Sequence, residues 1–412
     1  MTLVPASGIS VRFDDCVLID GSGLPPVPGA TVVVGEDGRI AYAGPSAAAP
    51  ATPEATVVDL GGRTLMPGFF DCHVHMSMVP GRGLAEGLTA DPVVDVLSTA
   101  ARLRETLHAG VTTVRDLGGT PAGFRTAVEQ GLIEGPRMQV AVKVIGHTGG
   151  HADCSLPSGI DAAPWLTEIA DTPDGVRLAT RKVLRAGADV IKVCATGGMG
   201  SPYDDPDDEG LTQEEMRAAV SEGRRHRGRP VAAHAQGAAG IRNALLSGVA
   251  SIEHAYGISD ELCDLTLEQE ATLVPTLATG LRPLDRAAMP DYHYRKKSRW
   301  AGSTKENIAH AIARGVRIAV GTDAGVTPHG QNLRELGHLV ELGMDPMAAI
   351  VAGTRTSAHL LGVDDALGTV EAGKIADLVV AQGDPLADIG LLGRPQNIVL
   401  VVQAGVIRKN LL

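Results

Sequence analysis

The stretch FFDCHVHM (residues 69–76) is an apolar run that ends in two histidines one residue apart. In a β-strand, successive side chains alternate between two faces, so His73 and His75 share one side of the strand. A single histidine near a strand end is usually structural or solvated. The pair by itself is therefore compatible with an accident of strand composition or with half of a metal site.

Seven further apolar runs follow this stretch, and amphipathic segments such as VVDVLSTAARLRETLHAG (residues 93–110) separate them. The seven runs are GVTTVRDLG, RMQVAVKVIG, ADVIKVCATGG, PVAAHA, ASIEHA, TLVPTL and VRIAVGTDAG. Nearly continuous apolar strands that alternate with helices indicate parallel strands buried on both faces. Eight such strands predict an α/β chain whose residues 67–366 form a (β/α)8 TIM barrel. A doubly wound open sheet is the alternative, but it would place a glycine-rich phosphate loop after the first strand, where DCHVHM stands.

Outside the barrel, the two ends of the chain resemble each other in pattern. Short β-prone runs separated by Gly and Asp turns occur both in residues 9–66 and after residue 367, as in TVVVGEDGRIAYAG and NIVLVVQAGVIRKN. We therefore expect residues 1–66 and 367–412 to build one small β-sandwich domain into which the barrel is inserted.

The composition limits the class of protein. The net charge is −12, which disfavours nucleic acid and anionic membranes as partners. The five cysteines form no CxxC pair, which favours a reducing compartment over a disulfide framework. Neither a signal peptide nor an apolar run long enough for a membrane helix is evident. We expect a cytoplasmic protein.

Polar residues recur at the carboxyl ends of the predicted strands. They are His73, His75, Lys192, His234, His254 and Asp323. In a barrel these ends surround one mouth, where the catalytic groups of this architecture collect. Imidazole and carboxylate are ligands for divalent metals, whereas a lysine in the apolar context DVIKVCATGG must be paired or chemically changed. The sequence thus predicts a metal centre at the barrel mouth.

The same features resemble the amidohydrolase superfamily over essentially the whole chain: HVH after the first strand, a strand-four lysine, single histidines on strands five and six, and GTDAG on strand eight. The segments LMPGFFDCHVH and LGTVEAGKIADLVV are similar to those by which that superfamily enters and leaves its barrel. The resemblance implies two divalent metal ions per chain, zinc first among them. His73, His75 and Asp323 would hold one ion, His234 and His254 the other, with a carboxylated Lys192 bridging them.

The implied reaction is hydrolysis of an amide or peptide bond. A metal-bridging hydroxide would attack the carbonyl, and Asp323 would act first as general base and then as general acid. A non-catalytic scaffold of the same fold is the rival, but such proteins often lose metal ligands, and all six are present here.

Three stretches, GHTGGHAD, SPYDDPDDEGLTQEE and IEHAYG, resemble the branch that holds prolidase-like Xaa-Pro and Xaa-Arg peptidases, ochratoxinase and imidazolonepropionase-like proteins. That resemblance implies that His147 and Tyr256 face the substrate, either one as oxyanion donor. His151, Arg115 and His329 are candidates for binding a substrate carboxylate. For Arg115 and His329 the alternative is solvent exposure, and for Tyr256 it is a rim aromatic bonded to a loop.

The small-molecule substrate is accordingly expected to be a dipeptide, an N-acyl amino acid or an aryl amide. A cyclic amide, lactone or carbamate is the alternative, although hydrolases of such rings mostly use one metal and do not need the strand-four lysine. Relatives commonly form homo-oligomers, so we expect one here.

Overall fold

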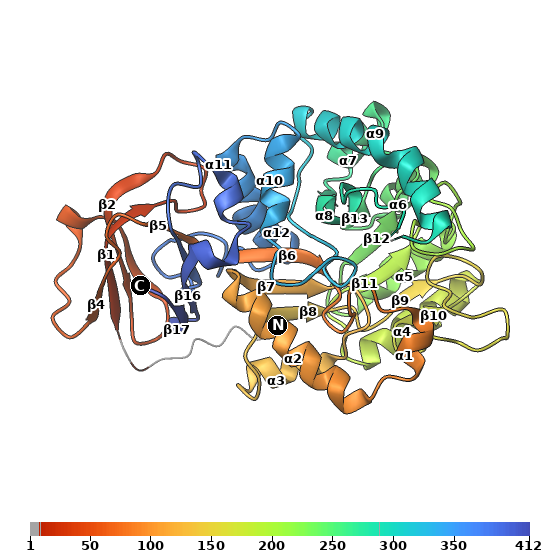
Figure 1. Cartoon of the computed structure of the whole chain (residues 1–412), viewed down its shortest axis with the longest axis horizontal. Coiled ribbons are helices and arrows are strands. Elements are labelled where there is room, and N and C mark those ends of the chain that lie inside the picture. The colour runs from red at the N-terminus through yellow and green to blue at the C-terminus, as the bar shows by residue number, and fades with distance from the viewer. Residues whose placement is uncertain (1–7, 9, 288) are drawn as a thin grey trace.

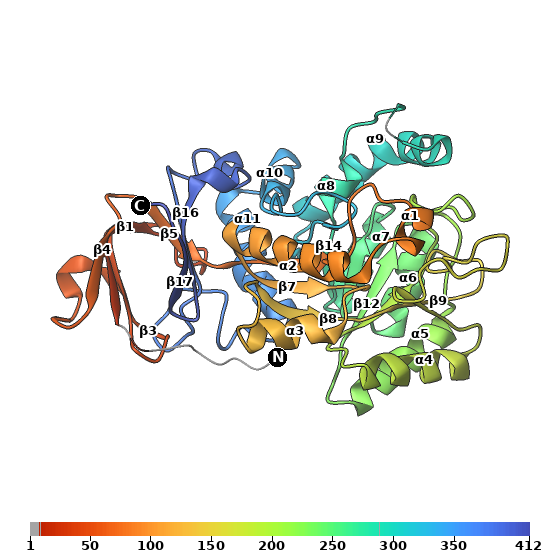
Figure 2. The same cartoon turned by 60° about the horizontal axis from the view of Figure 1, so that its bottom comes forward.

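The computed structural model describes residues 8, 10–287 and 289–412. Its strands fall into one mixed sheet of eight strands and two parallel sheets of six and three strands. In Figures 1 and 2 the mixed sheet lies at one end of the molecule, and the parallel strands lie at the other with helices around them. The predicted α/β class is confirmed.

Both ends of the chain contribute to the mixed sheet, whose strand order is β17-β16-β15-β5-β1-β2-β3 with β4 paired to β1. Its strands are β1 (Val11–Leu18), β2 (Val27–Val34), β3 (Ile40–Pro45), β4 (Thr56–Asp59), β5 (Thr64–Pro67), β15 (Leu378–Ala381), β16 (Ile398–Gln403) and β17 (Val406–Asn410). The N-terminal and C-terminal arms meet where β5 pairs antiparallel with β15, and they share one apolar core. A single connected sheet thus carries the β-rich pattern of both arms.

The parallel strands have the orders β6-β7-β8 and β10-β9-β11-β12-β13-β14. They are β6 (Phe69–Val74), β7 (Val111–Asp116), β8 (Arg137–Val140), β9 (Val144–Gly146), β10 (Thr167–Ile169), β11 (Ile191–Cys194), β12 (Val231–Ala235), β13 (Ser251–His254) and β14 (Thr272–Val274). The run RMQVAVKVIG, which we expected to form one strand, is divided between β8 and β9. The break falls at Val142, whose φ of 66° is incompatible with an extended strand.

Helices separate most of the parallel strands, although the described residues form none between β8, β9 and β10. They are α1 (Leu84–Leu88), α2 (Pro92–His108), α3 (Ala122–Glu129), α4 (Pro173–Arg185), α5 (Gln213–Arg225), α6 (Ala238–Ser247), α7 (Asp260–Glu268), α8 (Leu277–Gly280), α9 (Asp291–Ala313), α10 (Arg334–Glu341), α11 (Pro346–Val351) and α12 (Ser357–Leu360). Local sequence sets their ends: Thr212 and Glu215 form a capping box at α5, and Asp91 caps α2 ahead of Pro92. No helix in the described part of the chain is long and apolar enough to cross a membrane.

The last predicted strand, VRIAVGTDAG, does not form a regular strand; it makes only isolated bridges. Its backbone nevertheless bonds to β14 on one side, where Ala319 N donates to Leu273 O (2.9 Å), and to β6 on the other, where Cys72 N donates to Val320 O (2.7 Å). A close approach is needed at Gly321, because a Cβ there would lie 2.3 Å from a Val274 methyl carbon and 2.9 Å from His73 Cβ. The segment therefore links the two parallel sheets and places Asp323 beside β6.

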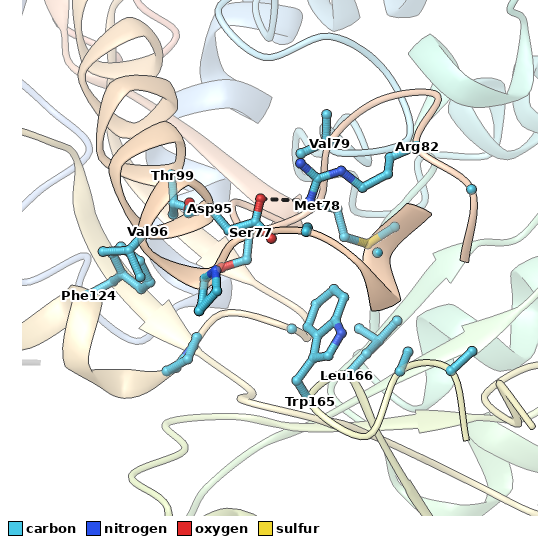
Figure 3. A pocket seen from close by; sticks show the side chains of 18 residues that line it. Ser77, Met78, Val79, Arg82, Asp95, Val96, Thr99, Phe124, Trp165 and Leu166 are labelled. Carbon is cyan, nitrogen blue, oxygen red and sulfur yellow. Dashed lines mark hydrogen bonds and ion pairs between the residues drawn. The ribbon is translucent and has the colours of Figure 1, made fainter. Parts of the chain in front are cut away.

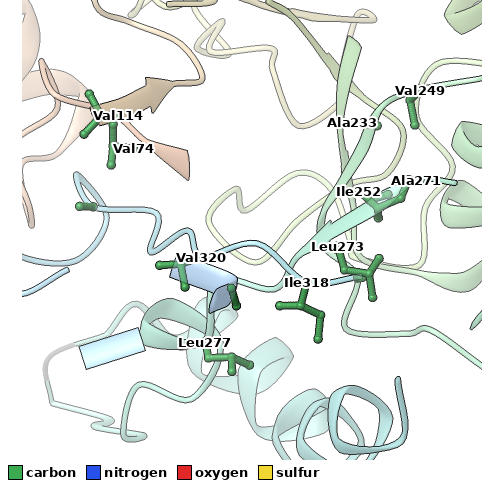
Figure 4. Packing of buried hydrophobic residues seen from close by; sticks show 14 of the residues in the cluster. Val74, Val114, Ala233, Val249, Ile252, Ala271, Leu273, Leu277, Ile318 and Val320 are labelled. Carbon is green, nitrogen blue, oxygen red and sulfur yellow. The ribbon is translucent and has the colours of Figure 1, made fainter. Parts of the chain in front are cut away.

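A second contact lies at the opposite side of these sheets. Asp189 N, just before β11, donates to Val140 O at the end of β8 (2.8 Å), and Gly119 N donates to Val142 O (2.9 Å). The largest apolar cluster spans both parallel sheets; Figure 4 shows Val74 and Val114 from one, Ile252 and Leu273 from the other, and Val320 from the connecting segment. Cys72 is buried in a different cluster with Ala358 and Leu361 from the region of α12, so it packs away from the histidines, as alternation predicts.

Candidate metal centre

The six residues that the sequence singled out are buried and all line one cavity of about 180 Å³. His73 is in β6, and His75 follows it directly. Lys192 is in β11, His234 in β12, His254 at the end of β13, and Asp323 in the segment after α9. These residues are up to 250 positions apart in the chain. Five of them converge because their strands are parallel and end on the same side, and Asp323 joins them because its segment is bonded to β6.

His73, His75 and Asp323 form a compact group, in which one ligand atom from each residue lies within 4.8 Å of the others. Asp323 Oδ1 is 3.3 Å from His75 Nε2 and 3.6 Å from His73 Nε2. Two imidazoles and a carboxylate at this spacing are a suitable ligand set for a divalent metal ion.

Each of the four histidines has one ring nitrogen occupied by a protein partner. His73 Nδ1 donates to Glu253 Oε2 (2.8 Å), His75 Nδ1 to Gly118 O (2.8 Å) and His234 Nε2 to Gly197 O (3.0 Å). His254 Nδ1 lies 2.7 Å from Thr276 Oγ1. This hydroxyl donates its own hydrogen bond to Pro275 O (2.8 Å), so it accepts from the His254 ring. Such partners orient metal-binding histidines and leave the second nitrogen of each ring for the ion.

The protonation states also suit metal binding. Burial lowers the pKa of His73, His234 and His254 well below the usual value, and the neighbouring cationic groups add to this effect. For His75 burial likewise lowers the pKa, but the bond to Asp323 and the charges of Asp323 and Asp116 outweigh it, so the pKa is raised. Metal ligation requires neutral imidazole, which the first three rings already provide.

Lys192 carries a buried polar atom of the cavity that lacks compensation. Its side chain is 3% exposed, and Nζ has no hydrogen-bond partner among the described residues. Burial is the main cause of its lowered pKa. A buried amine without a partner is costly, and a ligand or a covalent modification would relieve that cost. The donor set of the cavity therefore fits the divalent metal ions that the amidohydrolase resemblance implies.

The backbone at the site departs from ordinary conformations. The left-handed region is occupied by His254 (φ 76°), Ala255 (φ 55°), Thr276 (φ 50°) and Asp323 (φ 59°), none of which is glycine. Such conformations cost about 1–3 kcal/mol each and persist at sites where the surroundings enforce them. Two of the four residues are candidate ligands, and a third positions one of them.

A buried ion pair behind the metal site was not anticipated from the sequence. Glu253 is fully buried and accepts from His73 on one oxygen and from Arg115 Nη2 on the other (2.8 Å). Arg115 also donates to Cys72 O (2.7 Å) and Ser251 Oγ (3.1 Å), and it is 1% exposed. Both expectations for Arg115, a substrate-carboxylate ligand and solvent exposure, are wrong: its donors are directed to the strands beneath the cavity. An acidic residue inside the apolar strand ASIEHA was the available signal for Glu253.

Two more buried carboxyl groups that the sequence analysis missed hold the loops around the ligands. Asp71 accepts from Thr322 Oγ1 (2.6 Å) and Asn332 Nδ2 (2.7 Å), and burial raises its pKa to about 6. Glu335 accepts from the backbone N–H groups of Leu277 (2.6 Å) and Ala278 (2.7 Å), next to Thr276, and burial raises its pKa to about 8. Nothing near Glu335 in the sequence marks it, because its partners lie 57 and 58 residues away.

The candidate substrate-binding residues occupy different places. His151 lines the cavity; its ring stacks on His234 with centroids 4.3 Å apart, and its Nδ1 is 2.9 Å from Asp204 Oδ2. His147 is half-buried with Nδ1 bonded to Thr148 O (2.9 Å), and it is not among the residues that line the cavity. Direct contact of His147 with substrate stays a prediction.

Tyr256 and His329 both lie just behind the cavity wall. The Tyr256 ring is 5.7 Å from that of His254, and its hydroxyl lies 3.1 Å from Thr276 Oγ1 and 3.2 Å from Thr276 O, so it also supports the strained turn there. His329 bonds through Nε2 to Met78 O (3.3 Å), and burial lowers its pKa to about 4. Because His329 is 5% exposed, the solvent-exposed alternative is wrong for it. Substrate contacts of both residues stay predictions.

Comparison with known proteins agrees with this geometry. The sequence model of the amidohydrolase family matches residues 64–408. Ochratoxinase from Aspergillus niger is 32% identical over 415 residues, which cover 94% of this chain and 84% of the relative. Imidazolonepropionase from Sphingopyxis alaskensis is 26% identical, with 90% of this chain and 89% of the relative covered.

Solved structures show the same relationship. The crystal structure of a Xaa-Pro dipeptidase with bound methionine in its active site superimposes with a TM-score of 0.87 at 31% identity, covering 97% of this chain and 99% of the other. The resemblance inferred from the sequence is thereby confirmed. The chain belongs to the amidohydrolase family and is a hydrolytic enzyme that acts on amide bonds.

Proposed function

We propose that this enzyme hydrolyses amide or peptide bonds of small substrates with the help of two divalent metal ions, zinc in the first instance. The observation that carries the proposal is the cavity itself. Four of its histidines, each with one ring nitrogen held by the protein, line it together with a buried lysine amine that has no hydrogen-bond partner within the described residues. When bound, the ions would polarise the substrate carbonyl and activate water at neutral pH.

In this proposal His73, His75 and Asp323 hold one ion, and His234 and His254 hold the other. Lys192 would contribute as a carbamate, which forms when its neutral amine nitrogen bonds to the carbon of carbon dioxide and releases a proton. The resulting anion would supply oxygen ligands at a position where Nζ has no hydrogen-bond partner among the residues that the structure describes. The lowered pKa of Lys192 favours the neutral amine that this addition needs.

In this proposal Asp323 transfers a proton from water to the leaving nitrogen. Its carboxylate lies in the same cavity as the two histidines of β6 and is 7% exposed, so bulk water does not compete strongly for it. It accepts a proton from the attacking water and returns it to the leaving nitrogen. His147 or Tyr256 would donate to the developing oxyanion; for Tyr256 this requires its hydroxyl to turn from Thr276.

The substrate class we favour is a dipeptide, an N-acyl amino acid or an aryl amide. The similarity to ochratoxinase and to the Xaa-Pro dipeptidase supports it. Hydrolysis of a cyclic amide, a lactone or a carbamate is the second candidate, which the weaker similarity to imidazolonepropionase supports. Lys192 in the cavity favours the first candidate, because a one-metal ring hydrolase has no need of it.

The domain arrangement is part of the same proposal. We infer that the two parallel sheets, together with residues 317–324, close into a (β/α)8 barrel formed by residues 67–366, and that residues 1–66 and 367–412 form the second domain. The backbone bonds at both joins support closure. A cytoplasmic location and a homo-oligomeric state stay predictions.

The test combines elemental analysis with a substrate panel of Xaa-Pro and Xaa-Arg dipeptides, N-acyl amino acids, aryl amides and lactones. We expect about two divalent ions per chain and hydrolysis of at least one linear amide. Lys192→Ala should bind at most one ion and lose activity, whereas Lys182→Ala, on the exposed side of α4, should retain both. An enzyme loaded with two ions and bicarbonate that hydrolyses no amide of the panel, or a fully active Lys192→Ala, would overturn the proposal.

A further inference from the structure

Beside the catalytic cavity lies a second, larger hollow of about 420 Å³, called here the outer pocket. It is formed by the loop after β6 (around Met78 and Arg82), the N-terminal part of α2 (around Val96), the start of α3 (Phe124) and the loop between β9 and β10 (around Trp165). Figure 3 shows Trp165 and Leu166 on one side of it and Met78 on another. None of the six candidate metal ligands lines it.

The outer pocket adjoins the catalytic cavity. Met78 and Leu166 line both hollows, so their side chains are the shared wall. Met78 N donates to His75 O (3.0 Å). The carbonyl oxygen that accepts from the His75 ring belongs to Gly118, and the next residue, Gly119, lines the outer pocket. To reach this space, a substrate whose amide carbonyl lies at the candidate ligands must extend one of its ends past Met78 and Leu166.

The chemistry of the outer pocket selects a neutral apolar group. Of the 18 lining residues only Ser77, Arg82, Asp95 and Thr99 carry polar side chains. Arg82 and Asp95 already pair with each other (2.7 Å), and Thr99 Oγ1 donates to the Asp95 carbonyl (2.8 Å). A charged group entering here would lose hydration without gaining an unpaired counter-charge.

Two of the 18 residues that line the pocket are aromatic, in a chain that is 3% aromatic. One of the two tryptophans and one of the four phenylalanines line it. Trp165 is 43% exposed and Val96 is 51% exposed, so a ligand could still bury apolar area on both. The Trp165 ring packs directly on the backbone of Gly119. A Cβ at residue 119 would lie 2.6 Å from this ring, and the φ of +92° there also favours glycine.

We propose that the outer pocket binds one bulky apolar group, an aryl or large alkyl substituent, of the amide substrate. This proposal rests on the proposed function and narrows it to amides that carry such a group on one side of the scissile bond. Burial of an aryl group on Trp165, Leu166 and Val96 is expected to raise kcat/KM about 10- to 100-fold over a substrate with a methyl group there.

The test uses two pairs of substrates that share N-acetyl-L-alanine, which has a methyl group on both sides of the amide. N-(2-naphthoyl)-L-alanine enlarges the acyl side, and N-acetyl-L-tryptophan enlarges the amine side. In one of the two pairs, the bulky member should be hydrolysed at least about 10-fold more efficiently. Val96→Trp, which fills the pocket from an exposed helix position, should abolish that preference. Leu97→Trp, on the same helix but outside the pocket, is the matched control. Trp165→Ala should weaken the preference by removing the apolar wall. This variant replaces Val96→Trp in the test if Val96→Trp does not fold.

Calorimetric titration with 2-naphthamide and acetamide separates the two proposals, because it needs no turnover. Wild type should bind 2-naphthamide at least about 10-fold more tightly than acetamide, and Val96→Trp should lose this difference. If that holds while no amide is hydrolysed, the pocket stands and the proposed function fails. If amides are hydrolysed with no preference for bulk, or with a preference that neither Val96→Trp nor Trp165→Ala changes, the outer pocket is not the binding site of that group.

Discussion

The catalytic cavity and the outer pocket share a wall but are built in opposite ways. The cavity is small, and its candidate ligands are buried and, apart from Asp323, lie on or directly after strands. Each of the four candidate histidines is held by a specific hydrogen bond. The outer pocket is larger, apolar and partly exposed, and loops and helix starts form it. Chemistry that depends on sub-ångström placement is thus carried by the rigid part of the fold, and recognition by the part in which substitutions are tolerated. Substitutions in the two regions should therefore differ sharply in effect.

The largest effect is expected at the centre of the cavity. Asp323→Asn keeps the size of the side chain but removes its ability to take up and return a proton, so kcat should fall about 100- to 10,000-fold. Steady-state kinetics on the best substrate of the panel, with the metal content measured in parallel, checks this. A variant that retains two ions and more than a tenth of the wild-type kcat would remove Asp323 from proton transfer.

The second-largest effect is expected at the buried ion pair of Glu253 and Arg115. It tests whether this pair positions the candidate metal ligands of the cavity. Glu253→Gln leaves Arg115 buried without its carboxylate and weakens the bond that orients His73, so metal affinity should fall about 10- to 100-fold and thermal stability should drop. Metal titration and thermal unfolding measure the two changes. Glu222→Gln is the matched control, because Glu222 is also a buried glutamate paired with an arginine, Arg181, but outside the cavity. Equal loss of metal affinity in both variants would make the effect nonspecific.

A smaller effect concerns pH. The pKa of Glu335 is raised to about 8, so in the folded chain it keeps a proton that the unfolded chain releases near pH 4.5. Its contribution to the free energy of unfolding is therefore present below about pH 4.5, declines as the pH rises and is lost by about pH 8. Glu335→Gln should flatten the decline in melting temperature between pH 5.5 and 8.5. Parallel curves for wild type and variant would contradict this.

The smallest effect is expected at the rim of the outer pocket. Arg82 and Asp95 are 27% and 33% exposed in their side chains, so Arg82→Met should lower the free energy of unfolding by less than about 1 kcal/mol, and added salt should reduce the difference further. Chemical denaturation at two salt concentrations measures it. A loss of bound metal in this variant would show that metal binding in the catalytic cavity depends on the rim of the outer pocket.

Much of the cavity could be predicted because its evidence is local. The alternation in FFDCHVHM, the lysine in an apolar strand and GTDAG each place a ligand at a strand end, and parallel strands bring such ends together. Prediction was weakest where the chain leaves regular structure. RMQVAVKVIG broke at Val142, and VRIAVGTDAG became a connecting segment, because left-handed residues and close backbone contacts interrupted an apolar pattern that reads as a continuous strand.

By itself, the sequence determined the α/β class and the candidate metal ligands at predicted strand ends, since these follow from residue types and from periods of two along short strands. The family was inferred from the resemblance of its motifs to a known superfamily. The tertiary structure decided which nitrogen of each histidine remains available, that Arg115 serves Glu253 rather than a substrate, and that an apolar pocket adjoins the cavity. The physical reason is the same in each case: the partner lies far along the chain, as Glu253 lies 180 residues from His73. No local pattern records a contact of that kind; only the packing of the strands and loops brings it about.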